Sequence, residues 1–435
     1  VRNTWRTTCQ PKKWGQRWKR CLIRSCKCKI EEFNSTIVEF LAEVLFTLKI
    51  LQVIPYFYPA LSFGGPVRCV YHISRELSRK GHEVTVYTTN AFDFMTDFKV
   101  SGHEYSLDSI HVRYFRNVTR LGGLYLSPDM IHALKKGVQN SDIIHMHEYR
   151  TFQNVITHFY AQKYRRPYVI TAHGSIPLVV ERILLKKLFD DVFGDRILRD
   201  ACKLLASSKI EMKQYFHMGV PSNKIVIVPN GIKVELFETL PKPGTFKKEF
   251  KLDYDSAMIV YIGRVHKRKG LGFLLDAFAR LKDTNAVLVI AGPDEGYMSV
   301  LKEKASRLRI TEKVIFTGFI SERDKLAAYV DSEVVVYPGM HESFPLVPLE
   351  AALCSKPVIV SDDSVMGEIV THGGFGFSIR YGDVAQLRDC LLTILNDLTI
   401  AGEMGRKGRD FVKKNYNWRD IVSKLEHVYF DALAS

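Results

Sequence analysis

The chain has 435 residues, and 46% of them are hydrophobic, which is enough to build two cores. Its 62 basic and 47 acidic residues give a net charge of +15, but residues 1–30 alone hold ten basic residues and no acidic one. The other 405 residues carry only about +5, so a nucleic-acid-binding surface over the whole chain is disfavoured. The longest apolar stretch, 37–53, is interrupted by three charged residues, which excludes a transmembrane helix there.

Residues 1–46 form a basic extension with four of the eight cysteines and three of the four tryptophans. We expect this extension to be disordered or to lie outside the working protein, and a basic membrane tether is the alternative. Its cysteines lack the paired C-x2-C spacing of zinc sites, so no metal is expected there. The other cysteines stand in apolar or helical contexts, typical of reduced core residues in a cytoplasmic protein: Cys69, Cys202, Cys354 and Cys390.

Short strands and helices alternate from Leu48 onward. A strand over 49–54, a loop containing Gly64 and Gly65, and a helix over 67–79 predict a βαβ opening and therefore a parallel sheet. Further strands are predicted at 83–88, 110–115, 142–145, 168–171, 204–207 and 225–228. The G-x-G-x-x-G fingerprint is missing, which disfavours an NAD enzyme.

The stretch 177–201 is amphipathic, with leucine and phenylalanine residues set among lysine and arginine residues. Most such helices pack their apolar face on a sheet and leave the charged face in water. Contact with an anionic membrane surface is the alternative.

The sequence Val228-Pro229-Asn230-Gly231-Ile232 breaks the pattern after a strand and predicts a domain junction. The segment 238–254, which contains Pro241, Pro243 and Gly244, is predicted to be a linker. A second series follows, with a helix over 271–281, a terminal helix near the end of the chain, and strands at 258–262, 286–291, 314–317, 334–337 and 357–361. Two doubly wound α/β domains in series, 47–228 and 229–415, are therefore predicted.

In doubly wound sheets, ligands bind beyond the carboxyl ends of the strands. The loop after the strand 258–262 contains Arg264 and Lys269 between Gly263 and Gly270, and the next such loop contains Asp294. Glycines that allow close approach, two cations and a following helix are suited to a diphosphate. A solvated basic loop explains the cations equally well, and the P-loop pattern is not matched.

Two carboxylates, Glu342 and Glu350, follow the strand 334–337. Pro345 and Pro348 place the start of the next helix near residue 348, so Glu342 is expected on the loop and Glu350 in the first turn. They could form the acid/base pair of a glycoside hydrolase. Opposite a diphosphate loop, they would instead accept hydrogen bonds from sugar or ribose hydroxyls.

His145 and His147, followed by Glu148, stand at the end of a predicted strand and could suggest a metal site. We expect the two imidazoles to point to opposite faces of the sheet, so that both do not reach one ion. Zinc needs three or four converging ligands, and no metal is therefore expected here.

Taken together and in this order, the junction sequence, Gly263-Arg264 with Lys269-Gly270, Gly292-Pro293-Asp294 and the E-x7-E element from Glu342 to Glu350 resemble the family 4 retaining glycosyltransferases. These are group 1 glycosyltransferases of the GT-B fold. The resemblance covers about residues 48–430. It implies two Rossmann-like domains with the donor site in the cleft between them, and a terminal helix, 416–435, that crosses back onto the first domain.

The resemblance also implies roles for individual residues. Arg264 and Lys269 would bind the diphosphate of a nucleotide sugar, Glu342 would face its sugar, and Glu350 would hold the ribose. His173, in Thr171-Ala172-His173-Gly174-Ser175, would lie near the sugar and the acceptor. The remaining donor-binding positions implied are Gly64, Gly65, Gly263, Asp294 and the backbone N–H groups of Leu346 and Val347.

The expected reaction is hexosyl transfer with retention, in which a leaving-group phosphate oxygen takes the acceptor proton. The expected acceptor is a glycan or lipid-linked molecule in cell-surface polysaccharide or glycoconjugate synthesis. We expect no metal and no cofactor beyond the nucleotide-sugar donor, no specific nucleic acid, and a cytoplasmic location with peripheral contact to the inner membrane face as an option. The alternatives are a GT-B nucleotide-sugar epimerase and a non-catalytic nucleic-acid- or membrane-binding protein acting through its basic tail.

Overall fold

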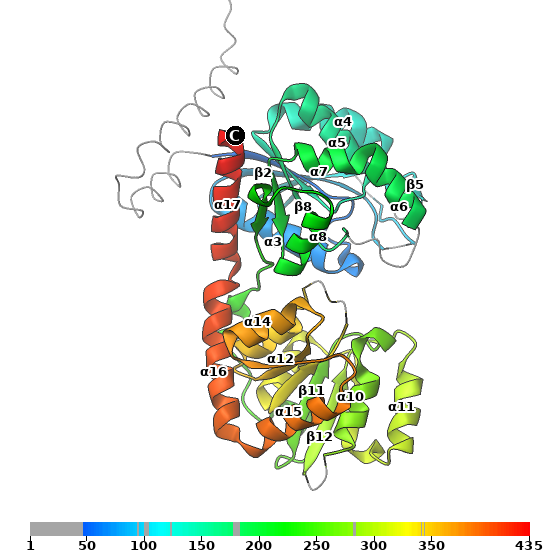
Figure 1. The fold of residues 1–435 in the computed structure, drawn as a ribbon, viewed down its shortest axis with the longest axis vertical. Coiled ribbons are helices and arrows are strands. Elements are labelled where there is room, and N and C mark those ends of the chain that lie inside the picture. Colours follow the sequence, from blue (N-terminus) through cyan, green and yellow to red (C-terminus); the bar gives the residue numbers. More distant parts are fainter. Residues whose placement is uncertain are drawn as a thin grey trace, which may run out of the picture. The chain divides into compact units, whose positions relative to one another are not determined.

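A computed structural model describes residues 47–93, 95–99, 104–121, 124–176, 183–281, 284–340, 342 and 344–435. The chain divides into two compact units, one that runs to Pro229 and includes Trp418–Ser435, and one that spans Asn230–Asn417 (Figure 1). The sequence-based bounds, 228 and 416, differ from these by at most two residues. The expectation of disorder for 1–46 lies outside the described residues.

The first unit contains an eight-stranded sheet in the order β10-β9-β8-β7-β1-β2-β4-β3. All neighbours are parallel except β3 and β4. The strands are β1 Lys49–Val53, β2 Glu83–Thr89, β3 Glu104–Leu107, β4 Ile110–Phe115, β7 Ile143–His147, β8 Tyr168–Thr171, β9 Lys203–Ala206 and β10 Ile225–Ile227. Every strand predicted for this domain is present. The exposed edge strand β3 and the hairpin of β5 (Thr119–Leu121) and β6 (Leu124–Leu126) were missed, because they contain no long apolar run.

Helices cover both faces of this sheet. One face packs against α3 (Gly65–Arg79) and α17 (Trp418–Ala434). The other packs against α4 (Pro128–Asn140), α5 (Phe152–Tyr164) and α7 (Asp195–Asp200), and α8 (Lys209–His217) contributes Tyr215 to the same core. The amphipathic stretch predicted over 177–201 is described from residue 183. It contains α6 (Ile183–Phe189), a π-helical turn (Asp190–Gly194) and α7.

The C-terminal helix α17 is tied to the first unit by a buried polar cluster. Glu426 accepts hydrogen bonds from Nε2 of His82 at 2.6 Å and from Nζ of Lys80 at 3.0 Å. Burial by itself favours the neutral acid, but these two hydrogen bonds hold the pKa of Glu426 below its ordinary value. Trp418 and Tyr429 of the same helix pack into the core that α17 shares with α3.

The second unit contains a six-stranded parallel sheet in the order β13-β12-β11-β14-β15-β16. The strands are β11 Ala257–Ile262, β12 Ala286–Ala291, β13 Val314–Gly318, β14 Val334–Tyr337, β15 Val358–Ser361 and β16 Gly376–Ile379. The predicted strands are all present. Only β16 was missed, since its four residues contain a single aliphatic side chain, that of Ile379.

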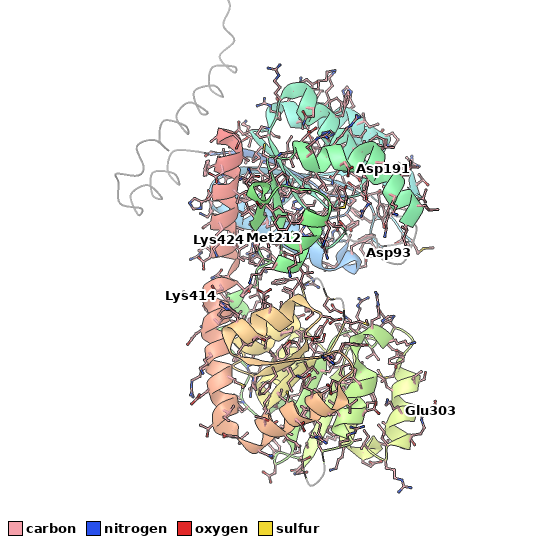
Figure 2. All side chains as sticks on the ribbon, in the orientation of Figure 1. Asp93, Asp191, Met212, Glu303, Lys414 and Lys424 are labelled. Atoms are coloured by element: carbon pink, nitrogen blue, oxygen red, sulfur yellow. The ribbon has the colours of Figure 1, made fainter. Side chains whose placement is uncertain are left out.

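The helices of the second unit are α9 Thr245–Glu249, α10 Leu271–Phe278, α11 Met298–Arg307, α12 Glu322–Asp331, α13 Val347–Leu353, α14 Val365–Gly373, α15 Val384–Asn396 and α16 Leu398–Asn415. Their apolar sides bury against the sheet. Charged residues such as Glu303 on α11, and Lys424 on α17 of the first unit, lie on exposed faces (Figure 2). Within the described ranges, no helix combines the length and apolarity that crossing a bilayer requires.

The prediction that 238–254 is a linker is wrong, because this segment packs onto the second unit. The ring of Phe246 on α9 is buried in the core. The buried carboxylate of Asp331 accepts hydrogen bonds from the N–H groups of Gly244, Phe246 and Lys247 at 2.6, 2.8 and 3.0 Å. A long-range carboxylate therefore fixes the start of α9, which local proline and glycine content did not reveal.

Candidate active site

Three loops at the carboxyl ends of β11, β12 and β14 approach each other closely in the second unit. A Cβ atom on Gly292 would lie 1.9 Å from the carbonyl oxygen of Gly263, so only glycine fits there. Gly270 has φ +72°, and a Cβ on it would lie 2.4 Å from the carbonyl oxygen of Pro338. These glycines let the backbone bring Arg264, Asp294 and Glu342 to one edge of the sheet.

Lys269 is buried at the centre of this edge. Its Nζ donates to Glu342 at 2.5 Å and to the hydroxyl of Tyr337 at 3.0 Å, and its side chain is 8% exposed. Burial and the Glu342 carboxylate raise the pKa of Tyr337 above its ordinary value, so this phenol stays protonated. The structure therefore joins two of the predicted residues, Lys269 and Glu342, through a direct ion pair.

Arg264 lies at the surface of the same edge. Its Nη1 contacts Oε1 of Glu295 at 2.7 Å, and the two side chains are 58% and 36% exposed. An exposed pair of this kind contributes only about 0–1 kcal/mol, so a competing anion can displace Glu295 at little cost. Asp294, beside it, accepts hydrogen bonds from Tyr297 and Met298 at the start of α11, and these N–H groups lower the pKa of its carboxyl.

Glu350 lies in the first turn of α13, as predicted from Pro345 and Pro348. Its two carboxylate oxygens accept hydrogen bonds from Nζ of Lys325 at 3.1 Å and from the hydroxyl of Tyr329 at 2.7 Å. Burial alone would lower the pKa of Lys325, but Glu350 and Glu322 raise it above its ordinary value. The carboxylate is thus held in one orientation with lone pairs left for further donors.

Leu346 and Val347 open the helix α13, the first as the residue before it and the second as its first residue. The first N–H groups of a helix have no partner within that helix. The binding of donor oxygens by these two N–H groups stays a prediction.

In the first unit, the predicted His173 stands in a turn at the end of β8. Its backbone is left-handed, with φ 51°. The turn is held by α8, because the carboxylate of Glu211 accepts a hydrogen bond from the N–H of Gly174 at 2.7 Å, and the hydroxyl of Tyr215 accepts one from the N–H of Ala172 at 3.1 Å. Burial lowers the pKa of His173 to about 4, so its ring is neutral near pH 7.

The expectation that His145 and His147 point to opposite faces is wrong. Consecutive residues of a strand alternate, so residues two apart share a face. The two ring centroids lie 3.9 Å apart, and Nδ1 of His147 lies 2.9 Å from Nε2 of His173. Burial lowers the pKa of both strand histidines well below 6.5. Among the described residues, no group of three or more His, Cys, Asp or Glu side chains could hold a metal ion.

Glu148 follows His147 and has the same kind of left-handed backbone as His173, with φ 64°. Its carboxyl is buried and accepts a hydrogen bond from the hydroxyl of Tyr56 at 3.0 Å. Burial raises the pKa of Glu148 to about 7, against the opposing hydrogen bonds from Tyr56 and Ser175. A carboxyl group with this pKa can donate or accept a proton near neutral pH.

An aromatic contact connects the predicted glycine loop to the carboxyl group of Glu148, because Phe63 stacks on Tyr56, which donates to Glu148. Gly64, with φ 77°, follows the 3-10 turn Leu61–Phe63, and Gly65 begins α3. The ring of Phe63 stacks on that of Tyr56 with centroids 4.0 Å apart. A Cβ on Gly64 or Gly65 would meet no described atom within 4 Å, so backbone conformation, not crowding, favours glycine at Gly64.

Sequence reasoning found the charged residues after the strands but missed the groups that hold them. The missed residues occupy buried or half-buried positions and share a hydrogen-bonding tip: Gln52, Tyr56, Lys325, Tyr329 and Tyr337. A glutamine within the apolar run of β1 was the one available signal, because a buried amide needs partners.

Two family models match the chain, "Glycosyltransferase Family 4" over residues 63–236 and "Glycosyl transferases group 1" over residues 244–411. Glycogen synthase of Mycobacterium tuberculosis is 27% identical over 401 residues, covering 86% of this chain and 93% of that protein. Phosphatidyl-myo-inositol mannosyltransferase of Mycobacterium leprae is 24% identical over 394 residues, covering 88% and 96%.

The fold is also that of solved structures. An Anabaena protein in complex with UDP-glucose superposes with a TM-score of 0.66 at 20% identity, covering 87% of this chain and 98% of that one. At this identity the likeness establishes the fold alone. Two Rossmann-like units, the spacing of the site residues and the two family models that together span most of the sequence lead to one conclusion: the chain belongs to the group 1 glycosyltransferases and has the GT-B fold.

Proposed function

We propose that the chain is a retaining hexosyltransferase that uses a nucleotide-diphosphate sugar as donor. The observation that carries this proposal is the buried Lys269, which is hydrogen-bonded to Glu342 at the carboxyl end of the second sheet. Removing a cation and a carboxylate from water costs free energy. We propose that this cost serves function, because Lys269 can bind Glu342 in the free protein and the diphosphate of the donor in the complex. The UDP-glucose bound by the Anabaena protein supports the same ligand class.

In this proposal the residues of the second unit bind the donor. Lys269 and Arg264 neutralise the diphosphate as negative charge develops on the leaving group. Glu342 accepts hydrogen bonds from the sugar hydroxyls, and Glu350, held by Lys325 and Tyr329, accepts those of the ribose. The two cations supply the charge that a metal ion would otherwise provide, so we expect transfer to persist in the presence of a chelator.

Retention is proposed from the resemblance to the retaining family 4 glycosyltransferases, and the contacts of both carboxylates favour a route without a covalent intermediate. Glu342 is paired with Lys269 and Glu350 with Lys325, which makes neither a ready nucleophile. The acceptor hydroxyl would then attack the face from which the diphosphate leaves, and a phosphate oxygen would take its proton. His173 is proposed to contact the sugar and the acceptor as a neutral hydrogen-bonding group.

A lipid-linked acceptor at an anionic membrane is proposed from the surface of α6. Its side chains Leu184, Leu185 and Leu188 are 82%, 63% and 58% exposed, and Lys186 and Lys187 lie among them. Exposed leucines with lysines suit the headgroup region of a bilayer. The name of the M. leprae relative, a phosphatidyl-myo-inositol mannosyltransferase, is consistent with such an acceptor.

Vesicle co-sedimentation tests this surface. The double variant Leu184→Gln with Leu185→Gln should lose most of its binding to vesicles of anionic phospholipid. The matched control is Phe319→Gln, because Phe319 is an apolar side chain of the second unit that is 81% exposed. Equal binding of both variants would contradict the proposal.

A panel of nucleotide-diphosphate sugars, read by nucleotide release with and without a membrane glycolipid extract, tests the donor and the acceptor together. We expect one donor to release nucleotide much faster when acceptor is present, with the anomeric configuration retained in the product. Nucleotide release without a transferred product, and with a changed sugar, would favour the alternative of a GT-B nucleotide-sugar epimerase.

A further inference from the structure

A continuous chain of hydrogen bonds runs through the interior of the first unit and ends at His173. Nε2 of His173 meets Nδ1 of His147 at 2.9 Å, and Nε2 of His147 meets Oε1 of Gln52 at 2.6 Å. The amide of Gln52 in turn donates to the hydroxyl of Tyr429 at 3.4 Å. Nδ1 of His145 lies 2.7 Å from the same hydroxyl. The chain thus connects β1, β7, the turn after β8 and α17.

The orientation of one amide sets the direction of every bond toward His173. Gln52 directs its nitrogen to Tyr429, so its oxygen, which can only accept, faces Nε2 of His147. Nε2 of His147 therefore carries the hydrogen. Because burial keeps the ring of His147 neutral, its Nδ1 has no hydrogen and must accept from Nε2 of His173.

The same logic fixes the other ring nitrogen of His173. A neutral imidazole with hydrogen on Nε2 has a free lone pair on Nδ1. Within the part of the chain that the structure describes, no group hydrogen-bonds Nδ1 of His173. The left-handed backbone at His173 holds the ring in this turn at the carboxyl end of β8.

We propose that Gln52 and His147 are positioning residues that fix His173 as its Nε2–H tautomer, so that Nδ1 accepts a hydrogen bond from a substrate hydroxyl. This inference rests on the proposed function, in which His173 meets the sugar or the acceptor. Gln52 and His147 are both fully buried, so they act only through His173 and do not touch substrate themselves. The fixed tautomer selects a hydroxyl donor over a carbonyl or ether oxygen at that position.

The tautomer is measured directly by two-bond ¹H–¹⁵N NMR of the ligand-free full chain labelled with ¹⁵N-histidine, near pH 7.5. His173→Gln identifies the signals of His173. We expect the wild type to show hydrogen on Nε2 of His173, and Gln52→Met to show a mixture of both tautomers. Alongside, kcat for sugar transfer should fall roughly tenfold to a hundredfold in Gln52→Met, while KM for the donor stays nearly constant.

Two further variants separate positioning from a general loss of packing. His147→Asn keeps an amide oxygen able to accept from His173 and should retain the wild-type tautomer, whereas His147→Leu should lose it. Thr157→Val is the matched control, because Thr157 is also buried and, among the described residues, its hydroxyl bonds only the carbonyl oxygen of Gln153, at 2.7 Å. It should leave both the tautomer and kcat unchanged.

The proposal is overturned if wild-type His173 carries hydrogen on Nδ1, or if Gln52→Met leaves its tautomer as in the wild type. The NMR readout does not depend on turnover. A wild-type protein that transfers no sugar from the donor panel would therefore refute the proposed function, while the tautomer of His173 would still be decided on its own.

Discussion

The two units use parallel sheets of the same kind, but different chemistry follows their strands. In the second unit, charged pairs stand at the carboxyl ends: Lys269 with Glu342, Arg264 with Glu295, and Lys325 with Glu350. In the first unit, the corresponding ends of β7 and β8 carry neutral histidines, one buried carboxyl group with a pKa of about 7 and a buried ion pair of Arg150 with Asp190. Similar backbones thus present several ion pairs in the second unit, and in the first unit mostly neutral hydrogen-bonding groups beside one buried ion pair.

This difference indicates two kinds of ligand. Paired cations can exchange a protein carboxylate for a dianion with little change in net charge, which suits a diphosphate. Neutral imidazoles, and a carboxyl group that is protonated below about pH 7, hold uncharged hydroxyl groups without the desolvation cost of a full charge. The variants below test whether the division holds, beginning with the largest expected effect.

Lys269→Met should have the largest effect, because it removes the buried cation and leaves Glu342 without its partner. We expect kcat/KM for the donor to fall by roughly 10²–10³, the scale on which a single electrostatic group contributes to catalysis. Lys267→Met, an exposed lysine on the same 3-10 turn, is the control and should retain turnover. Steady-state nucleotide release measures kcat/KM for both variants. An equal loss of kcat/KM in the two variants would contradict a specific role of Lys269.

Arg264→Ala should come next, with turnover reduced by a factor on the order of a hundred. Its ion pair with Glu295 is exposed, so the free energy of unfolding should change by less than about 1 kcal/mol. Near-normal turnover would exclude Arg264 from leaving-group stabilisation. Arg268→Ala, on the neighbouring exposed turn, provides the comparison.

Glu148→Gln should stabilise the protein at high pH, because it removes a buried carboxyl group whose pKa is raised. Burial raises the pKa of Glu148 to about 7 from 4.5, so the folded state loses stability as pH rises from 4.5 to 7. Glutamine removes this penalty. The free energy of unfolding of the variant minus that of wild type should therefore be larger at pH 8 than at pH 4 by about 1–3 kcal/mol. Chemical denaturation at both pH values measures the difference, and a gain independent of pH would contradict the raised pKa.

Glu426→Gln should have the smallest effect, a loss of about 1–2 kcal/mol in the free energy of unfolding at pH 7. The folded-state pKa of Glu426 lies below its ordinary value, so its contribution is complete above about pH 4.5 and is lost as pH falls through the folded pKa. The difference in the free energy of unfolding between wild type and variant should therefore become smaller as the pH falls below about 4.5. Lys424→Gln, on the exposed face of α17 (Figure 2), should behave like wild type at every pH.

The alternation of apolar runs predicted nearly all strands, because strands buried on both faces need continuous apolar sequence. The start of α13 was predicted from Pro345 and Pro348, since proline is tolerated only in the first turn of a helix. By contrast, β3 and β16 were missed, because neither contains an apolar run long enough to stand out.

By itself, the sequence determined the fold class, the presence of two α/β domains in series and the charged residues that follow their strands. The reason is that burial and backbone geometry impose local patterns on the sequence. Only the tertiary structure decided which side chains meet. Lys269 pairs with Glu342 across 73 positions, and the hydrogen-bond chain that includes Gln52 spans 377 positions to Tyr429. Such pairings depend on how strands and helices pack in space, and the protonation states of the buried histidines and of Glu148 depend on those partners in turn.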